Sequence, residues 1–297
     1  MSNLKFLLGP MRLPFLTLPP VCVLLGVGTA SWTQGKINVW YALIAFVGAL
    51  ASHISVNALN EYFDFRSGLD SHTRPTPFSG GSGTLPAHPE AARGALITGL
   101  VTLAIAAVVG IFFVTVWGWE LLPLGILGLA LLVIYTPWIT RFPFLCLIAP
   151  GLGFGTFMVM GTDFVLTGHY SWTAFFASLV PFFLVSNLLL LNQFPDADAD
   201  RTVGRRHYPI TIGRRKASII YGAFVVGAYL AIVVGWLIGV LPWPSLLGLL
   251  TLYVGVRCII GAYRYADEID KLIPYLAQNV ILNITLPLLT AIGLLIA

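Results

Sequence analysis

Nine long apolar segments follow one another through this chain, separated by short polar connections. A helix needs about 20 mostly apolar residues to cross the hydrocarbon core of a bilayer, and each segment is close to this length. The segments lie near residues 11–33, 38–59, 91–116, 120–138, 143–162, 172–194, 217–239, 245–263 and 273–296. Only 9% of the 297 residues are charged, whereas a soluble domain carries about 25%. We therefore predict an all-α, polytopic membrane protein with nine transmembrane helices in a single domain, residues 1–297.

The first segment could also be read as a cleavable signal peptide, so its length matters. The apolar stretch of a typical signal peptide has about 7–15 residues. Residues 11–33 are longer, are interrupted by Pro19 and Pro20, and are followed by eight further apolar segments. We expect this segment to be retained as a transmembrane helix.

Basic residues gather on one side of the predicted bundle. With nine crossings, every Lys and Arg except Lys36 falls on the side that holds the N-terminus. Cytoplasmic loops carry such an excess of basic residues. We therefore predict a cytoplasmic N-terminus in the cell inner or plasma membrane. All acidic residues except Glu120 and Asp163 fall on that same side, which the rule does not require.

Two polar motifs follow the second and the sixth apolar segments and share one spacing. The first, NEYFDFRSGLD, places Asp64 four residues after Asn60. The second, NQFPDADADRTVGRR, places Asp196 four residues after Asn192, and Asp200 a further four along. Residues four apart lie on one face of a helix, so each Asn and its Asp point the same way. We expect the cytoplasmic loops 60–90 and 192–216 to carry the two motifs.

Carboxylates that converge in this way repel one another unless a cation lies between them. Hard oxygen ligands suit Mg²⁺, which also shares phosphate oxygens. The predicted metal ligands are Asn60, Asp64, Asp70, Asn192, Asp196 and Asp200. Neighbouring arginines are suited to bind phosphate through bidentate hydrogen bonds. The predicted diphosphate-binding residues are Asn60, Arg66, Arg74, Arg141, Asn192, Arg201 and Arg205. We hypothesise a magnesium–diphosphate site at the membrane surface, with the hydrocarbon tail of the ligand between helices.

Two simpler interpretations of the motifs need to be weighed. Solvated helix ends with local salt bridges would explain any one aspartate, but not the same N-x-x-x-D pattern at two equivalent helix ends. The D-x-D-x-D spacing of the second motif is also similar to the start of an EF-hand loop. That loop needs Gly at its sixth and Glu at its twelfth position, where this chain has Arg201 and His207. Calcium binding is therefore excluded.

At these residues the chain resembles the UbiA superfamily of intramembrane prenyltransferases. The N-D-x-x-D signature of that family, with a further Asp downstream, is matched by Asn60, Asp64 and Asp70, and its D-x-x-x-D signature by Asp196 and Asp200. A Tyr and a basic residue after the fourth helix also recur in the family, and Tyr135 and Arg141 match them. The resemblance implies a nine-helix UbiA-like bundle that moves an isoprenoid chain from its diphosphate onto an acceptor.

Within that superfamily the motifs are most similar to the 1,4-dihydroxy-2-naphthoate polyprenyltransferases of menaquinone synthesis. Asp70 follows Asp64 by six residues, and Gly204 and Arg205 continue the second motif in register. Glu61 and Gln193 depart from the usual Asp and Asn. The resemblance therefore implies 1,4-dihydroxy-2-naphthoate as the first acceptor to consider, with 4-hydroxybenzoate, homogentisate or a non-quinone acceptor as alternatives.

We expect the site to divide its work between metal-binding, diphosphate-binding and aromatic residues. Metal and arginines would neutralise charge on the leaving diphosphate, and an aromatic face would stabilise the allylic cation left behind. Tyr62, Phe63 and Tyr135 are candidates, of which we favour Tyr135. The predicted catalytic residues are Asp64, Asp70, Asp196, Asp200 and Tyr135. The expected cofactor is Mg²⁺, and the expected partners are a polyprenyl diphosphate, an aromatic acceptor and the lipid bilayer, with no nucleic acid.

Some polar residues need a separate explanation. The loop from Ser71 to Pro86 is either a flexible cap over the site or an ordinary hydrophilic linker. His53 shares a helical face with Asn60 and either contacts the acceptor or has a structural role. For Asn187 and other asparagines inside apolar segments we favour hydrogen bonds between helices.

Functions of other classes fit the sequence less well. A cation- or proton-coupled transporter would place its polar residues near the midplane of the membrane, whereas here they gather at one face. A CDP-alcohol phosphotransferase would carry the D-G-x-x-A-R signature, which is missing. A purely structural membrane protein would not need the twin motifs. The active site of the predicted enzyme would open toward the cytoplasm.

Overall fold

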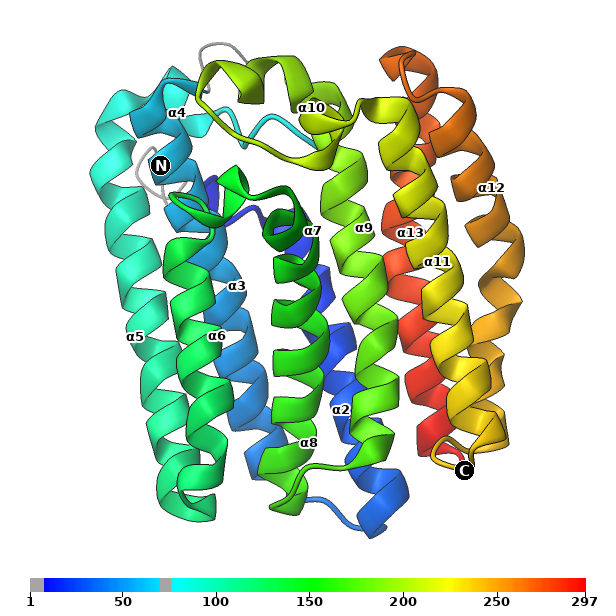
Figure 1. Cartoon of the computed structure of the whole chain (residues 1–297). Helices are drawn as coiled ribbons and strands as arrows, with labels where there is room; N and C mark the ends of the chain where they lie inside the picture. The colour runs from blue at the N-terminus through cyan, green and yellow to red at the C-terminus, as the bar shows by residue number, and fades with distance from the viewer. Residues whose placement is uncertain (1–7, 70–75) are drawn as a thin grey trace.

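The computed structural model describes residues 8–69 and 76–297 as a bundle of helices, and this part of the chain contains no strand. The long helices lie side by side, and the short helices α4 and α10 cover one end of the bundle (Figure 1). We call this end, to which α3 and α9 both lead, the charged end. In chain order the helical elements are η1 (Leu13–Thr17), α2 (Leu18–Gln34), α3 (Val39–Ser67), α4 (Thr84–Ala87), η3 (Pro89–Ala91), α5 (Ala92–Trp117), η4 (Trp119–Leu121), α6 (Leu122–Ile134), η5 (Ile139–Arg141), α7 (Pro143–Gly151), η6 (Leu152–Val159), α8 (Met160–Thr167), α9 (Trp172–Thr202), α10 (Tyr208–Thr211), α11 (Arg214–Leu237), η7 (Trp243–Thr251), α12 (Leu252–Arg264) and α13 (Ile269–Leu295).

The helices reproduce the predicted apolar segments closely. Within the described ranges, eight helical segments are long and apolar enough to cross a membrane. The predicted segment near 120–138 forms a shorter apolar helix, Trp119–Ile134. The all-α membrane fold is thus confirmed, whereas nine crossings and a cytoplasmic N-terminus stay predictions.

Helices carry residues 60–67 and 192–202 of the two acidic motifs, which corrects the expectation of loops at these residues. Helix α3 continues past the apolar segment and ends only at Gly68, whose φ of 79° is the left-handed conformation that favours glycine at a helix end. Helix α9 likewise continues to Thr202, with Pro195 inside it. The motif side chains are therefore held on rigid backbone, and helical spacing controls where they point.

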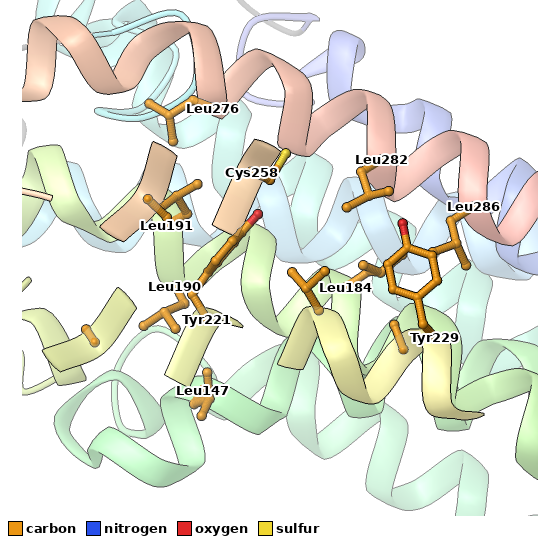
Figure 2. Packing of buried hydrophobic residues seen from close by; sticks show 14 of the residues in the cluster. Leu147, Leu184, Leu190, Leu191, Tyr221, Tyr229, Cys258, Leu276, Leu282 and Leu286 are labelled. Carbon is orange, nitrogen blue, oxygen red and sulfur yellow. The ribbon is translucent and has the colours of Figure 1, made fainter. Parts of the chain in front are cut away.

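The largest apolar cluster joins α9 to the C-terminal helices. It packs residues of α9, α11, α12 and α13 together, and Figure 2 shows Leu184, Tyr221 and Leu286 among them. Hydrogen bonds cross the same helices: Asn187 Nδ2 donates to the Tyr221 carbonyl at 2.7 Å, and Tyr221 Oη donates to Asn279 Oδ1 at 2.9 Å. The expected bonding between helices is confirmed for Asn187, and α9 is held by this half of the bundle.

The segment Pro143–Thr167 changes its helical pitch where it meets α9. Its middle part, η6, is a π-helix that follows Pro150. A Cβ added at Gly155 would lie 2.5 Å from both Phe182 N and Ser178 O, so only glycine permits this close approach to the α9 backbone. Wide turns of this kind often occur at functional sites. Gly153 and Phe154, in the same π-helix, line two cavities.

Candidate active site

A cavity of about 220 Å³ at the charged end brings the two motifs together. Helix α3 contributes the first motif and α9 the second, and residues 78–81 close over the cavity from the segment after α3. The predicted site residues that line it are Asn60, Asp64, Tyr135, Asn192, Asp196, Asp200 and Arg205. Residues far apart in the sequence therefore share one site.

The Arg205 guanidinium connects the two motifs. Its Nη2 forms an ion pair with Asp64 Oδ1 on α3, and its Nη1 donates to Asp200 Oδ1 on α9 at 2.9 Å. Burial lowers the pKa of Arg205, but the Asp64 and Asp200 carboxylates raise it more, and the net pKa lies above the usual value for arginine. Arg205 thus remains charged and neutralises both carboxylates.

A buried histidine, which our sequence analysis did not assign to the site, supports Asp200. His207 Nε2 lies 2.8 Å from Asp200 Oδ2, and both side chains are almost completely buried. A backbone hydrogen bond of 3.1 Å from Arg205 N to the Asp200 carbonyl closes the turn that follows α9. The sequence does not predict this contact, because His207 follows Asp200 by seven residues and reaches it only through the turn that lies between them.

Two acceptor atoms in the second motif have no partner. Asn192 Oδ1 and Asp196 Oδ1 are both buried without a hydrogen bond, although buried polar atoms are nearly always paired. Both side chains line the cavity together with Asp200. Carboxylate and amide oxygens are the donors that Mg²⁺ prefers, so the residues present fit this ion.

The described residues do not form a ready-made metal cluster. No group of three or more His, Cys, Asp or Glu side chains within ranges 8–69 and 76–297 is arranged to hold a metal. Two of the carboxylates at the cavity, Asp64 and Asp200, instead pair with Arg205. Asp70 lies outside the described residues, and its predicted role is not tested.

The first motif is held in place by an arginine that sequence analysis counted only toward topology. Arg12 Nε donates to Glu61 Oε1 at 2.7 Å, and its Nη2 donates to Asn60 Oδ1 at 3.0 Å. Glu61 also accepts from Ser82 N at 2.7 Å and from Ser82 Oγ at 2.8 Å. Arg12 has a φ of 51°, unusual for a residue with a side chain. Glu61, the departure from the family motif, therefore ties the N-terminal segment and the 76–82 segment to α3.

Several predicted site residues lie elsewhere. Arg66, Arg141 and Arg201 are exposed and do not line the cavity. Arg74 lies outside the described residues. A role for these four arginines in diphosphate binding stays a prediction, whereas Arg12 and Arg205 are the arginines that the structure places at the cavity.

Tyr135 lies at the cavity, directly after α6. Cys146 lines the same cavity, and Gln193 Nε2 donates to Cys146 Sγ at 3.3 Å. Neither Tyr62 nor Phe63 lines the cavity; instead their rings pack against each other at 5.6 Å. Of the three aromatic candidates, Tyr135 is therefore the one that lines the cavity, and its catalytic role stays a prediction.

A second cavity of about 410 Å³ continues from the first into the apolar interior. Residues lining both are His53, Val56, Leu131, Leu132, Gly153 and Phe154. The His53 ring packs edge-on against Phe154 at 4.8 Å, and its buried Nδ1 has no hydrogen-bond partner. His53 therefore marks the junction between the polar and apolar parts of the site.

The fold is that of an integral membrane protein, and it contains a polar cavity and a largely apolar cavity that share part of their lining. Residues 20–280 match the model of the UbiA prenyltransferase family, and the chain belongs to that family and is a prenyltransferase.

Curated relatives carry two kinds of name. The chain is 27% identical over 237 residues to a 1,4-dihydroxy-2-naphthoate octaprenyltransferase of Bacillus subtilis (strain 168), which covers 77% of this chain and 73% of that protein. It is 26% identical over 239 residues to a digeranylgeranylglyceryl phosphate synthase of Natronomonas pharaonis, covering 78% of each chain. The two names differ, and both relatives are less than 30% identical to this chain.

Solved structures support the fold. A structure described under the biosynthesis of digeranylgeranylglyceryl phosphate synthase in membranes superposes with a TM-score of 0.68 at 15% identity, over 100% of both chains. A UbiA homolog from Archaeoglobus fulgidus bound to DMAPP and Mg²⁺ superposes with a TM-score of 0.61 at 11% identity, over 99% of both. The bundle described above is thus shared with other members of the family.

Proposed function

We propose that this protein transfers a polyprenyl chain from its diphosphate to 1,4-dihydroxy-2-naphthoate, in a reaction that requires Mg²⁺. The observation that carries this proposal is the pair of joined cavities: carboxylates and cations line one, and apolar side chains line the other. Such a pair suits a molecule with an anionic head and a hydrocarbon tail. The B. subtilis relative supports the choice of acceptor.

The residues suited to hold Mg²⁺ are Asn60, Asp64, Asn192, Asp196 and Asp200, with Asp70 as the predicted sixth. When bound, the ion neutralises charge on the diphosphate as it leaves. The orphaned oxygens of Asn192 and Asp196 support this set, because both are buried at the cavity without a hydrogen-bond partner.

Arg205 and Arg12 provide the positive charge for the diphosphate head. Both line the 220 Å³ cavity of the two motifs, which we call the head-group cavity because it would hold the diphosphate. Each arginine is already held by hydrogen bonds to motif residues. A guanidinium binds phosphate oxygens through two parallel hydrogen bonds, and it remains charged when buried. Because these hydrogen bonds already fix both side chains, each arginine would bind the leaving diphosphate with little further loss of side-chain entropy.

The reaction exchanges one bond of the prenyl carbon for another. The bond between that carbon and the diphosphate oxygen breaks, and the diphosphate leaves with the electron pair. A new bond forms to an electron-rich ring carbon of the acceptor, which gives up its proton or carboxyl group. Tyr135 lines the cavity where its ring can stabilise the allylic cation. Phe78, Ser79 and Gly80 also line the cavity, where they would help to keep out water that would quench the cation.

A direct assay tests this function. The purified protein in detergent or nanodiscs is incubated with a labelled prenyl diphosphate, Mg²⁺ and 1,4-dihydroxy-2-naphthoate, with EDTA as the control. We expect a prenylated naphthoate product that EDTA abolishes. Product from 4-hydroxybenzoate, homogentisate or a glycerol phosphate acceptor, with none from the naphthoate, would replace the proposed acceptor. Solute uptake into vesicles without prenyl transfer to any acceptor would contradict the function itself.

The face of the membrane at which the site opens is part of the same proposal. The charge distribution supports a cytoplasmic opening, because every basic residue except Lys36 belongs to the predicted cytoplasmic side. Labelling single cysteines introduced at exposed Arg201 or at exposed Trp243, near the opposite end, in sealed right-side-out vesicles would test it. We expect an impermeant reagent to label the second position and not the first.

A further inference from the structure

The lipid-facing side of α12 carries an arginine inside a membrane span. Helix α12 is the second part of the apolar segment Trp243–Arg264, which is long enough to cross a membrane and ends at the charged end (Figure 1). Arg257 is exposed on this helix, seven residues before Arg264, and thus about 10 Å from the end of the helix. Its neighbours on the same face, Val256 and Ile260, are 50% and 56% exposed. Arg257 therefore lies among apolar side chains that face lipid.

The opposite side of α12 fixes this orientation. A Cβ added at Gly255 would lie 2.6 Å from Tyr229 Oη, and a Cβ at Gly261 would overlap the ring of Tyr275. Cys258, the residue after Arg257, is completely buried. Because only small side chains fit where α12 meets its neighbours, a rotation of the helix cannot bring the larger arginine into the protein interior.

The guanidinium of Arg257 points away from the charged end. Side chains of a helix tilt toward its N-terminus, and the N-terminus of α12 lies toward the other end of the bundle (Figure 1). The guanidinium accordingly lies 5.7 Å from the centre of the ring of Tyr253, one turn earlier on α12. Among the described residues Arg257 forms no ion pair. A charge in hydrocarbon is costly without a counter-ion, so Arg257 lacks an anion that this chain does not supply there.

Two further arginines extend this surface to the charged end. The Arg215 guanidinium, in the first turn of α11, lies 3.9 Å from the centre of the Tyr263 ring in the last turn of α12. An arginine stacked on an aromatic ring can still donate hydrogen bonds from its edges. Arg264 follows Tyr263 and is exposed. We call the surface formed by these residues the arginine face; it comprises Arg215, Tyr253, Val256, Arg257, Ile260, Tyr263 and Arg264.

The carboxylates nearest in the sequence do not neutralise the arginine face. Asp267, Glu268 and Asp270 follow Arg264 in the connection to α13 and in its first turn. Glu268 pairs with Lys271 at 2.5 Å. In the part of the chain that the structure describes, none of the three arginines of the face forms an ion pair. The face therefore presents unpaired positive charge to the membrane.

We propose that the arginine face binds an anionic membrane phospholipid, whose phosphate is held by Arg257 and Arg264 and whose acyl chain packs along Val256 and Ile260. The occupant follows from charge and place, since a phosphate that reaches Arg257 must belong to a molecule that itself enters the hydrocarbon. Free phosphate does not meet this requirement. Basic surfaces between transmembrane helices bind anionic lipid head groups in this way. The inference does not rest on the proposed function, because no residue of the arginine face lines either cavity.

Native mass spectrometry of retained lipid tests the proposal. The full-length protein in detergent is mixed with equal amounts of dioleoylphosphatidylglycerol, which is anionic, and dioleoylphosphatidylcholine, which has the same chains and no net charge. We expect the wild type to prefer the anionic lipid by at least about tenfold, and Arg257→Gln to lower this preference about fivefold, as for loss of one cation near an anionic head group. Arg257→Lys should keep most of the preference. Arg93→Gln is the matched control, because Arg93 is also exposed at the charged end but lies on α5.

Three outcomes would overturn the proposal. The first is equal retention of the two lipids by the wild type. The second is an equal reduction by Arg257→Gln and Arg93→Gln, because the preference would then reflect only the net charge of this end of the protein. The third is a wild-type dimer that Arg257→Gln converts to a monomer with unchanged lipid retention, because the face would then be an interface between two copies of the chain. The thermal midpoint without added lipid checks that each variant folds, and Arg264→Gln provides the same comparison if Arg257→Gln does not.

Discussion

Arg205 donates a hydrogen bond to Asp64, a residue 141 positions earlier in the chain. The same guanidinium also pairs with Asp200, so one buried cation holds the two acidic motifs of the bundle together. A buried carboxylate is costly unless it is paired, and two facing carboxylates repel each other as well. Arg205 therefore neutralises the two facing carboxylates from within the protein. Under the proposed function, a bound metal ion would neutralise the same carboxylates.

Two aspartates of the second motif, Asp196 and Asp200, differ in how firmly they are held, which bears on how a cation would bind. Asp200 is fixed from three directions, by Arg205, by His207 and by the turn that follows α9. Asp196 has an oxygen with no partner at all. A cation that enters the cavity would therefore find free oxygens on Asp196 and Asn192, whereas Asp64 and Asp200 must first exchange their partner.

Asp196→Asn should abolish turnover without affecting the fold. Asp196 Oδ1 has no hydrogen bond in the structure, so an asparagine side chain, which has the same shape, breaks no native contact at this atom. The substitution removes the negative charge that Mg²⁺ binding needs. We expect kcat to fall by at least about a hundredfold, as for loss of a central catalytic interaction. The thermal midpoint in detergent is the control. Near-normal turnover at saturating Mg²⁺ would show that Asp196 is not a metal ligand.

Arg205→Met should destabilise the protein, and Mg²⁺ should restore part of the loss. The substitution leaves Asp64 and Asp200 buried without their shared cation, and breaking such a pair costs about 3–5 kcal/mol. Because a divalent ion can take over their neutralisation, we expect added Mg²⁺ to raise the thermal midpoint of the variant more than that of the wild type. Arg201→Met is the matched control, since Arg201 is exposed and does not line the cavity. The same response to Mg²⁺ in all three proteins would contradict this account.

Glu61→Ala should loosen the N-terminal segment and the 76–82 segment together. Glu61 accepts hydrogen bonds from Arg12 and from Ser82, so its removal leaves donors of both unpaired. We expect a loss of about 1–3 kcal/mol, reduced by the partial exposure of Arg12. Limited proteolysis should show faster cleavage near residues 76–82. Cleavage at the wild-type rate would mean that other contacts hold this segment.

Gly155→Ala should disturb the packing of η6 on α9. The added Cβ would lie 2.5 Å from Phe182 N and Ser178 O, and backbone atoms on both helices cannot yield cheaply. Overpacking of this kind costs about 1–3 kcal/mol. Gly110→Ala is the control, because a Cβ there would meet nothing within 4 Å. Equal thermal midpoints of the two variants would contradict the close approach.

Much of the fold follows from the amino-acid sequence, and for a clear reason. A helix is the only way for an isolated apolar segment to satisfy its backbone groups in lipid, so hydropathy alone locates the spans. The predicted segments 172–194 and 217–239 correspond to α9 and α11 within a few residues, apart from the polar extension of α9. The pairing of Asn60 with Asp64 on one face likewise needs only helical periodicity.

The distribution of the arginines was harder to predict. Arg66, Arg141 and Arg201 are close to the motifs in sequence but project to the surface, whereas Arg12 reaches the first motif from another element. His207 meets Asp200 only because the chain turns after α9. These contacts depend on how separate segments of the chain pack together. Neither the hydropathy pattern nor the spacing of residues predicts that packing.

The sequence by itself determined which segments enter the membrane and which residue types can hold a metal and a diphosphate, because these follow from local composition and helical repeat. Only the tertiary structure decided that Arg205 joins Asp64 to Asp200, that Arg12 contacts the first motif, and that an apolar cavity lies next to the cavity of the two motifs. The physical reason is that side chains on different helices meet through packing, and packing depends on the shapes of all the helices at once.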